Sequence, residues 1–323
     1  MKACSPALTD ELGPRMLSQV KVRDVHDGTR SVGAVTAEER HATVGGEELS
    51  RRLGIGLDTA NQMLKVTTQV GVRQAMHPLS RRYKTDLIHG TSARRLGGTW
   101  YSDTMFAPKK SLSSKTCAQV FTNTSLITVH PMEHKDEAGI ALTQFIDDVG
   151  IPDTLIFDCA GEQVGVDTDF QKTIRYYRVH QRQTEPYSPW QNRAEDAIKK
   201  LKTRWKRIKR ITKCSDRLWD YALSYEAKMM SLIPTGRDAR TPHEEVTGDT
   251  PDISEYLDFD FYDPVWYIHQ AGNPDDPRLG RWLGVSHRVG AAMCYWVLTA
   301  TGKVEARSTV QHVTKQDLEN EAI

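Results

Sequence analysis

Cysteine is scarce in this sequence, and the few cysteines present lie far apart. The chain has five among 323 residues, and the nearest two, Cys117 and Cys159, are 42 positions apart. A zinc knuckle needs cysteines a few residues apart, and a disulfide framework needs several within a short secreted chain. Both are therefore excluded, and the spacing is typical of proteins kept in a reducing, intracellular compartment.

Long apolar runs and an excess of one charge are also missing. No apolar stretch approaches the roughly 18 residues of a membrane helix, and Met1–Pro6 lacks the apolar core of a secretory signal. The 43 Lys and Arg residues balance 42 Asp and Glu residues, and a formal charge of +1 excludes a histone-like cation. With 38% hydrophobic residues the chain can bury a core, and its length predicts two or three folded units at about 150 residues each.

The N-terminal part divides into two stretches. Residues 1–44 mix Gly, Pro, Ser and charged residues without periodicity, and we interpret them as disordered. After them, Leu49 and Leu53 lie one helical turn apart, and the glycines of 54–56 interrupt the pattern before a second helix. This pattern predicts a helix-turn-helix-like domain with a linker over residues 45–90. It fits a DNA-binding motif, but an ordinary helical hairpin without DNA contact is the simpler interpretation of this segment alone.

Residues 91–248 are predicted to form an α/β domain with a mixed sheet. Strand-like segments cover residues 99–107, 116–132 (two strands broken near 123–125), 154–157 and 176–180. Helical spacing covers residues 135–149 and 170–174. Strands followed by a helix, a further strand and more helices indicate an α/β sandwich.

The C-terminal part begins with an acidic segment. Residues 249–263 contain six acids and no Lys, Arg or His, which predicts a solvated acidic linker over 249–262. Short strands are predicted over residues 265–269, 281–285, 294–299 and 304–313, with a hairpin turn at Thr301-Gly302. These strands predict a small five-stranded β-barrel over residues 263–323.

Two aspartates stand at informative places in the predicted sheet. Asp103 lies within strand 99–107 among apolar and aromatic residues, where burying a carboxylate is costly unless it is paired, hydrogen-bonded or metal-bound. Asp158 directly follows the apolar run 155–157, at the kind of strand end where ligand sites of α/β folds open. Each aspartate alone also fits a structural role, as a strand end or as the cap of a turn.

Glu195 opens the most strongly periodic element of the chain. Ser188 is a good N-cap and Pro189 suits a first helical position, so Glu195 is expected on the second turn of a helix. Taken alone, it also fits a solvated helical residue. The order of strand-Asp, strand-end-Asp and helix-Glu is more informative than any single acid, and it favours a carboxylate site for a metal.

The same helix is strongly basic. Nine of the fifteen residues from 199 to 213 are Lys or Arg and none is acidic. On the helical wheel, five lysines fall on the side of Glu195: Lys199, Lys202, Lys206, Lys209 and Lys213. A solvated face is the simpler interpretation, but solvated helices usually carry both signs of charge. Uncompensated positive charge over four turns favours an anionic partner, with duplex DNA first.

These residues resemble a known family. The triad Asp103, Asp158 and Glu195 resembles the acidic active site of retroviral and retrotransposon integrases, and the 36 residues between its last two acids are close to that family's spacing. The stretch Tyr187–Glu195 resembles the family's loop-to-helix motif, and Thr241–Asp252 resembles the segment after the core in copia-type retrotransposons. Over roughly residues 45–315, the chain is similar to the integrase of a copia-type LTR retrotransposon.

The resemblance implies a fold, an activity and cofactors. The expected fold is an RNase H-like core in 91–248, preceded by the helix-turn-helix segment and followed by a small SH3-like β-barrel. The expected activity joins mobile-element DNA 3′ ends to target DNA with two Mg²⁺ or Mn²⁺ ions. Asp103 would bridge both ions, and Asp158 and Glu195 would each hold one. Family members carry a His and Cys zinc domain before the core, but no cysteine precedes Cys117 except Cys4, so no structural zinc is expected.

The resemblance also implies partners. Lys199, Lys202 and Lys206 are expected to hold DNA ends beside the metals, and Gln191 and Asn192 to contact bases or sugars at the strand terminus. The expected partners are element ends, target duplex and further copies of this chain, acting in the nucleus, with no membrane and no small-molecule substrate. Two alternatives stay open: a non-catalytic, transposon-derived DNA-binding protein, and a nuclease of the same fold without strand transfer.

Overall fold

The chain divides into two compact units. The computed structural model describes residues 43–69, 94–158, 163, 165, 167–184, 192–235, 240–268, 277–287, 289 and 294–313. The α/β unit comprises residues 45–68 and 85–253, and the β unit comprises residues 1–44, 69–84 and 254–323. Most of the segment predicted to be disordered, residues 1–42, lies outside the described residues. No helix in the described ranges is long and apolar enough to cross a membrane.

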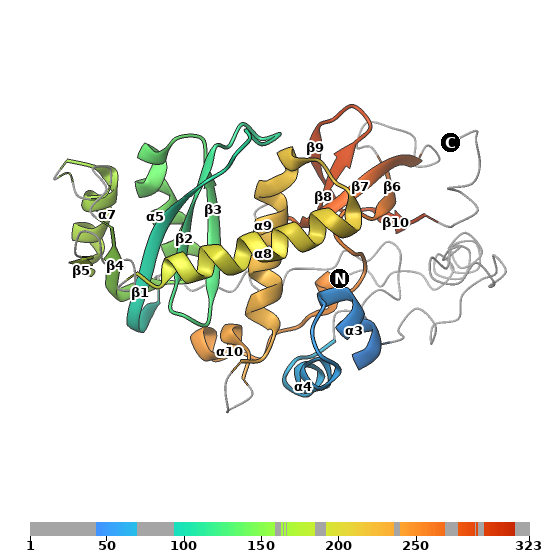
Figure 1. Ribbon diagram of the computed structural model, residues 1–323, viewed down its shortest axis with the longest axis horizontal. Coiled ribbons are helices and arrows are strands. Elements are labelled where there is room, and N and C mark those ends of the chain that lie inside the picture. Colours follow the sequence, from blue (N-terminus) through green and yellow to red (C-terminus); the bar gives the residue numbers. More distant parts are fainter. Residues whose placement is uncertain are drawn as a thin grey trace, which may run out of the picture. The chain divides into compact units, whose positions relative to one another are not determined.

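The α/β unit is built on a five-stranded mixed sheet (Figure 1). The strands lie in the order β3-β2-β1-β4-β5, with β1, β2 and β3 antiparallel and with β4 and β5 parallel to β1. Their bounds are Arg95–Phe106 (β1), Cys117–Thr122 (β2), Ile127–Met132 (β3), Ile151–Phe157 (β4) and His180–Gln183 (β5). The predicted mixed α/β fold is confirmed at this level.

Two helices precede this sheet in the sequence, and the others follow its first strands and pack around it. The helix pair predicted near the N-terminus is confirmed as α3 (Gly46–Leu53) and α4 (Leu57–Val66). The other helices are η3 (Lys135–Glu137), α5 (Ala138–Asp148), α7 (Asp169–Tyr177), α8 (Ala194–Thr212), η5 (Asp216–Leu218), α9 (Trp219–Leu232) and α10 (Pro242–Thr247).

Alternate residues of β1 place two cores on opposite faces of the sheet. On one face, the Trp100 ring lies 4.9 Å from the Phe145 ring of α5. On the other face, Met105 belongs to a buried cluster with Leu201 of α8 and Trp219 of α9. Asp103 shares the side of Met105 by this alternation, so β1 carries its carboxylate on the face covered by α8.

The N-terminal helix pair is joined to α8 by two arginines. Arg204 donates a hydrogen bond to the backbone oxygen of Leu53 at 3.0 Å, and Arg207 donates one to that of Arg52 at 3.2 Å. The last carbonyl groups of a helix have no partner within the helix and carry partial negative charge, so arginines stabilise the end of α3. Gly54 then ends α3 in the left-handed region at φ 61°, which explains the glycine at this break.

The strand predicted over residues 176–180 is wrong. The Thr168 hydroxyl accepts a hydrogen bond from the Gln171 backbone N–H, and the resulting helix α7 continues to Tyr177 before Arg178 turns the chain at φ 53°. The strand β5 follows at His180–Gln183, and all four of its residues are exposed. Because these residues are all polar, they show no alternation of apolar and polar residues that could predict a strand.

The β unit holds a second five-stranded sheet, which is antiparallel. Its strand order is β10-β6-β7-β8-β9. The bounds are Pro264–Ile268 (β6), Pro277–Val285 (β7), Tyr295–Thr299 (β8), Val304–Arg307 (β9) and Val310–His312 (β10), after the short helix η6 (Ser254–Tyr256). The predicted turn is confirmed, since Gly302 has φ 78° and donates to the Thr299 oxygen. Closure of this sheet into an SH3-like barrel stays a prediction.

The acidic segment before this sheet is largely buried, so the prediction of a solvated linker is wrong. Phe259 and Phe261 are each only 4% exposed, and Phe259 lies 5.9 Å from the Trp282 ring. Asp258 accepts a hydrogen bond from the Tyr295 hydroxyl at 2.8 Å. The aromatic residues between the acids therefore belong to the core of the β unit. The charge pattern of the segment alone does not predict their burial.

Candidate active site

The parallel pairing of β1 with β4 brings the two aspartates to neighbouring strands. Ser102 is paired with Phe157, so Asp103 and Asp158 each follow one residue later. Adjacent strands lie about 4.8 Å apart, which places the two residues side by side. Asp103 is half-buried and accepts a hydrogen bond from the Thr104 backbone N–H at 2.8 Å. Asp158 is exposed and accepts one from the Thr184 hydroxyl at 3.3 Å.

Glu195 comes from the first turn of α8. The helix begins at Ala194, and Arg193 is its N-cap, so the prediction that Ser188 and Pro189 start it was wrong. The reason is a tertiary contact: the Asn192 side chain bonds the Ala194 backbone N–H and also the neighbouring strand β1. Glu195 is exposed on the helix.

The three acids interact electrostatically. The pKa of Asp103 is raised from 3.8 to about 6, chiefly because burial disfavours its charged form. The hydrogen bond from Thr104 acts in the opposite direction, while the negative charges of Glu195 and then Asp158 raise the pKa further. The positive charge of Lys202 lowers it slightly. Folding therefore brings the predicted triad close enough for like charges to repel.

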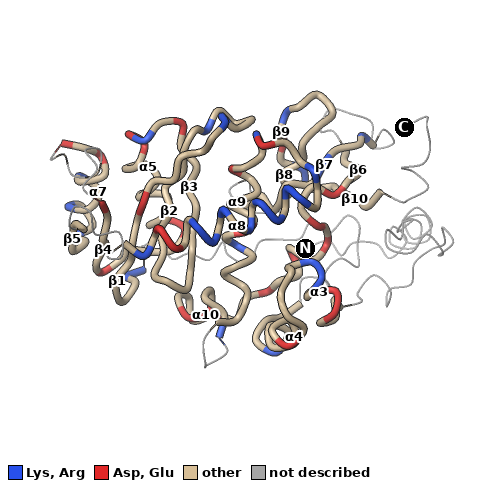
Figure 2. The backbone as a smooth tube through the Cα atoms, in the orientation of Figure 1, with Lys and Arg blue, Asp and Glu red and all other residues tan. Residues whose placement is uncertain are grey.

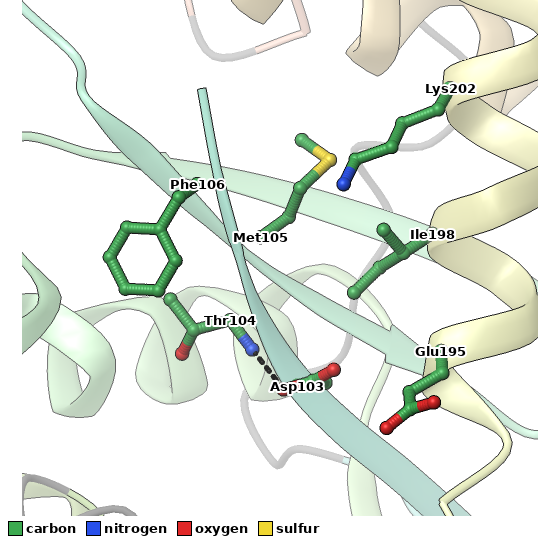
Figure 3. Close-up of a pocket in the computed structure, with 7 residues that line it drawn as sticks. All are labelled: Asp103, Thr104, Met105, Phe106, Glu195, Ile198 and Lys202. Atoms are coloured by element: carbon green, nitrogen blue, oxygen red, sulfur yellow. Dashed lines mark hydrogen bonds between the residues drawn. The ribbon is translucent and has the colours of Figure 1, made fainter. Parts of the chain in front are cut away.

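A pocket of about 320 Å³ lies between β1 and α8 (Figure 3). Its lining consists of Asp103, Thr104, Met105, Phe106, Glu195, Ile198 and Lys202. In Figure 3, Glu195 and Lys202 extend from α8 on the side of β1 where Asp103 lies, with Ile198 between them. The pocket therefore has two carboxylates at one end, an apolar wall and a cation at the other end. This arrangement suits a phosphate-containing ligand that contacts cations bound by the carboxylates at one end and Lys202 at the other end.

The donor chemistry of the acids fits a divalent cation. Carboxylate oxygens are the ligands that Mg²⁺ and Mn²⁺ prefer, and a cation would relieve the repulsion around Asp103. In the described part of the chain, no three His, Cys, Asp or Glu side chains lie close enough together to hold a metal ion. The acids would therefore have to move closer to one another to bind one.

Sequence reasoning missed a buried polar network behind Asp103. The Gln119 amide bonds the Ser102 hydroxyl at 2.6 Å and the Thr104 hydroxyl at 2.8 Å, and Asn192 donates to the Ser102 backbone oxygen at 3.1 Å. Ser102 and Gln119 are fully buried. The available signal was Gln119 itself, an amide within the apolar strand β2 and directly across from β1.

Figure 2 shows Lys and Arg along much of the length of α8, and two sets of them have different surroundings. Arg204 and Arg207 are half-buried and bond α3, as described above. Lys199, Lys202 and Lys206 are exposed, and within the described residues they form no ion pair. They lie on the same side of the helix as Glu195, so a row of unneutralised charge leads away from the acids.

The two other residues assigned to DNA have different positions. Gln191 lies outside the described residues. Asn192 is only 5% exposed, and its side-chain amide is hydrogen-bonded within the protein. DNA contact by either residue stays a prediction.

Comparisons with known proteins give similar folds only. No family model matches the chain, and no curated protein matches it. The chain is similar to the catalytic core domain of BIV integrase, at 19% identity and a TM-score of 0.37 over 46% of this chain and 93% of that one. It is similar to the HTLV-2 integrase catalytic core domain in complex with magnesium, at 16% identity and a TM-score of 0.37 over 49% and 99%.

A third similarity covers more of the chain. The simian T-cell lymphotropic virus intasome, in complex with a PP2A regulatory subunit, matches at 14% identity and a TM-score of 0.40 over 84% of this chain and 95% of that one. The residues of the site, rather than these similarities, carry the functional argument.

Proposed function

We propose that this chain is an integrase-like polynucleotidyl transferase of the copia-type retrotransposon class, which joins mobile-element DNA 3′ ends to target DNA. The proposal is supported by the pairing of β1 with β4, which brings Asp103 and Asp158 to neighbouring strands, and by the pocket that Asp103 and Glu195 of α8 both line. Their repulsion contributes nothing to stability. A phosphodiester transfer enzyme, however, needs such a carboxylate group to hold cations beside DNA.

The roles proposed for the acids are those that the resemblance to integrases implies. When bound, a pair of Mg²⁺ or Mn²⁺ ions would activate the attacking hydroxyl group and stabilise the leaving oxygen. Asp103, on the central strand, would contact both ions, while Asp158 and Glu195 would each contact one. Water or a DNA 3′-hydroxyl group is the nucleophile, so no side chain forms a covalent bond with the substrate. Attack by water hydrolyses a phosphodiester bond, whereas attack by the DNA 3′-hydroxyl group forms a new phosphodiester bond to the target strand as that strand's 3′-oxygen leaves.

The lysine row would hold the DNA. Lys202 lines the same pocket as Asp103 and Glu195 and is the lysine whose charge acts on Asp103. Lys199 and Lys206 lie one turn before and after it on the same side of α8. Each can neutralise one backbone phosphate, which guides a strand toward the acids without reading its sequence. We further propose that several copies assemble on the DNA and act in the nucleus.

A strand-transfer assay on a labelled duplex oligonucleotide with Mg²⁺ tests the proposal. Replacing Glu195 by Gln or Asp158 by Asn should lower joining by more than about 100-fold, because even residues that only support metal ligands cost 10–100-fold. The matched controls are Asp196→Asn, on the same turn of α8, and Asp153→Asn, on β4; both carboxylates are exposed and ion-paired. Joining at the wild-type rate by either triad variant would refute the assignment.

A non-catalytic DNA-binding protein is the second candidate. The lysine row favours it, because exposed positive charge on α8 requires an anionic partner but no chemistry. The two candidates differ in their response to divalent ions. A binding protein should retain its DNA affinity when Mg²⁺ is replaced by Na⁺ at equal ionic strength, and it should form no product. A nuclease of the same fold would require the ion but would cleave without joining.

A further inference from the structure

Asn192 connects the strand that carries Asp103 to the helix that carries Glu195. Its side-chain N–H donates to the backbone oxygen of Ser102 at 3.1 Å, and its side-chain oxygen accepts from the Ala194 backbone N–H at 3.1 Å. Ser102 directly precedes Asp103, and Ala194 directly precedes Glu195. One amide therefore spans the two elements at the point where each presents its acid.

The connection is buried and belongs to a rigid network. Asn192 is 5% exposed, and Ser102 and Gln119 are fully buried. The Gln119 side-chain N–H, from the neighbouring strand β2, donates to the Ser102 hydroxyl at 2.6 Å, so the residue that accepts the Asn192 bond is held through its side chain as well. Buried, hydrogen-bonded side-chain amides have little freedom, because an unsatisfied polar group in the interior costs about 1–3 kcal/mol.

Glu195 has no comparable restraint of its own. Its carboxylate is exposed, and no side chain in the described ranges forms an ion pair or hydrogen bond with it. Its position is set by where α8 begins, and the Asn192 side chain bonds the first backbone N–H of that helix. A small shift of this helix end would change the separation of Glu195 from Asp103.

We infer that Asn192 is a positioning residue, whose amide fixes the start of α8 against β1 and thereby sets the spacing between the Glu195 and Asp103 carboxylates. The inference rests on the proposed function for its chemical consequence, since that spacing would determine the affinity for the cations. The structural part, the fixed helix end, stands independently of any metal. Asn192 touches neither substrate nor reacting atoms in this role.

Two substitutions separate the bonds of Asn192. Asn192→Ser keeps a hydroxyl oxygen that can accept from the Ala194 N–H, but it is too short to reach Ser102. Asn192→Ala removes both bonds. The matched control is Asn123→Ser, because Asn123 also bonds backbone N–H groups, those of Ser125 and Leu126, but in the turn between β2 and β3.

Hydrogen exchange and Mn²⁺ titration on the full chain give two readouts besides activity. In Asn192→Ser, we expect the amides of residues 194–198 to exchange about tenfold faster without metal. The apparent dissociation constant for Mn²⁺ should rise about 10- to 100-fold. Asn192→Ala should show changes at least as large, and Asn123→Ser should change neither quantity.

The outcomes discriminate between the two proposals. Unchanged exchange at 194–198 in Asn192→Ser overturns the inference, whether or not the protein binds metal. Faster exchange with unchanged Mn²⁺ affinity also overturns it, since Asn192 would then only stabilise the helix. Faster exchange in Asn192→Ser, together with a wild-type protein that binds no Mn²⁺, supports the fixed helix end and counts against the proposed function instead.

Discussion

Two carboxylates in the α/β unit, the buried Glu226 and the half-buried Asp103, show how differently the same group can be surrounded. Glu226 of α9 is 2% exposed, and burial raises its pKa, but Arg204 lies 3.5 Å away and both Arg204 and Arg207 oppose that rise. Burial also raises the pKa of Asp103, where Glu195 and Asp158 add to the rise. The negative charge of Glu226 is thus offset by two nearby arginines, whereas Asp103 lies near the negative charges of Glu195 and Asp158.

The basic residues of α8 follow the same division. Arg204 and Arg207 contact Glu226 or the end of α3, whereas Lys199, Lys202 and Lys206 are exposed on the side of Glu195. Arginine suits the first task because its planar group makes several fixed hydrogen bonds, whereas lysine suits a surface that contacts phosphates as point charges. The difference shows that Arg204 and Arg207 stabilise the packing of α8, while Lys199, Lys202 and Lys206 are available to bind an anionic partner.

Removing Arg204 should have the largest effect on stability. Arg204→Ala leaves Glu226 buried without its nearest cation and breaks the bond to Leu53, so we expect a loss of about 3–5 kcal/mol in the free energy of unfolding. Urea denaturation measures this loss. The control Lys206→Ala, on the exposed side of the same helix, should change stability by less than about 0.5 kcal/mol. Equal losses of unfolding free energy in Arg204→Ala and Lys206→Ala would mean that the paired arginines and the exposed lysines of α8 do not differ in structural role.

The lysine row should dominate the salt dependence of DNA binding. Replacing Lys199, Lys202 and Lys206 together by Ala should lower the slope of log K against log salt by about 2.7, if each lysine contacts one phosphate. Fluorescence anisotropy with a labelled duplex at several salt concentrations measures the slope. A triple Ala variant at Lys65, Lys135 and Lys172, which are exposed elsewhere on the α/β unit, removes the same charge and should change it little. Identical slopes for both variants would exclude a localised DNA surface.

Asp103→Asn should stabilise the protein at neutral pH. Since the folded pKa of Asp103 is about 6, above its unfolded value near 4, the folded state binds the proton more tightly and loses stability as pH rises from about 4 through 6. The variant should therefore gain up to about 3 kcal/mol at pH 8 and nothing below pH 4. Urea denaturation across this pH range tests the sign. A destabilised variant at pH 8 would show that Asp103 has a structural role like that of Glu226.

The smallest predicted effect concerns how strongly Glu195 and Asp158 each raise the pKa of Asp103. Glu195→Gln should lower the pKa of Asp103 more than Asp158→Asn does, because the charge of Glu195 is the stronger of the two influences. Both changes should be smaller than the effect of burial. Carbon-detected NMR titration of the Asp103 carboxyl group measures them. No change in either variant would mean that the acids do not share a site.

The sequence alone predicts the strands β1 to β4, for a local reason. The strands around Trp100, Val120 and Leu155 are apolar runs with clear ends, and Asp103 and Asp158 are conspicuous within them. By contrast, the start of α8 depends on a bond between Asn192 and Ser102, which are 90 residues apart. No local pattern contains such a contact, so the helix was predicted to begin too early.

The same limit applies to charge. Arg204 and Lys206 are two positions apart in one basic run, and the sequence offers no reason to separate them. Only the packing of α3 and α9 against one side of α8 shows that Arg204 has partners inside the chain. The burial of the aromatic residues in 249–263 is not predicted, because the acidic charge pattern of this segment indicates a solvated linker.

A crystal structure of the full chain grown with Mn²⁺ tests the central claim most directly. The account predicts anomalous scattering from Mn²⁺ bound by carboxylate oxygens of Asp103, Asp158 and Glu195, and its loss in crystals of Asp103→Asn. Bound Mn²⁺ elsewhere only, with these three side chains turned apart, would contradict it.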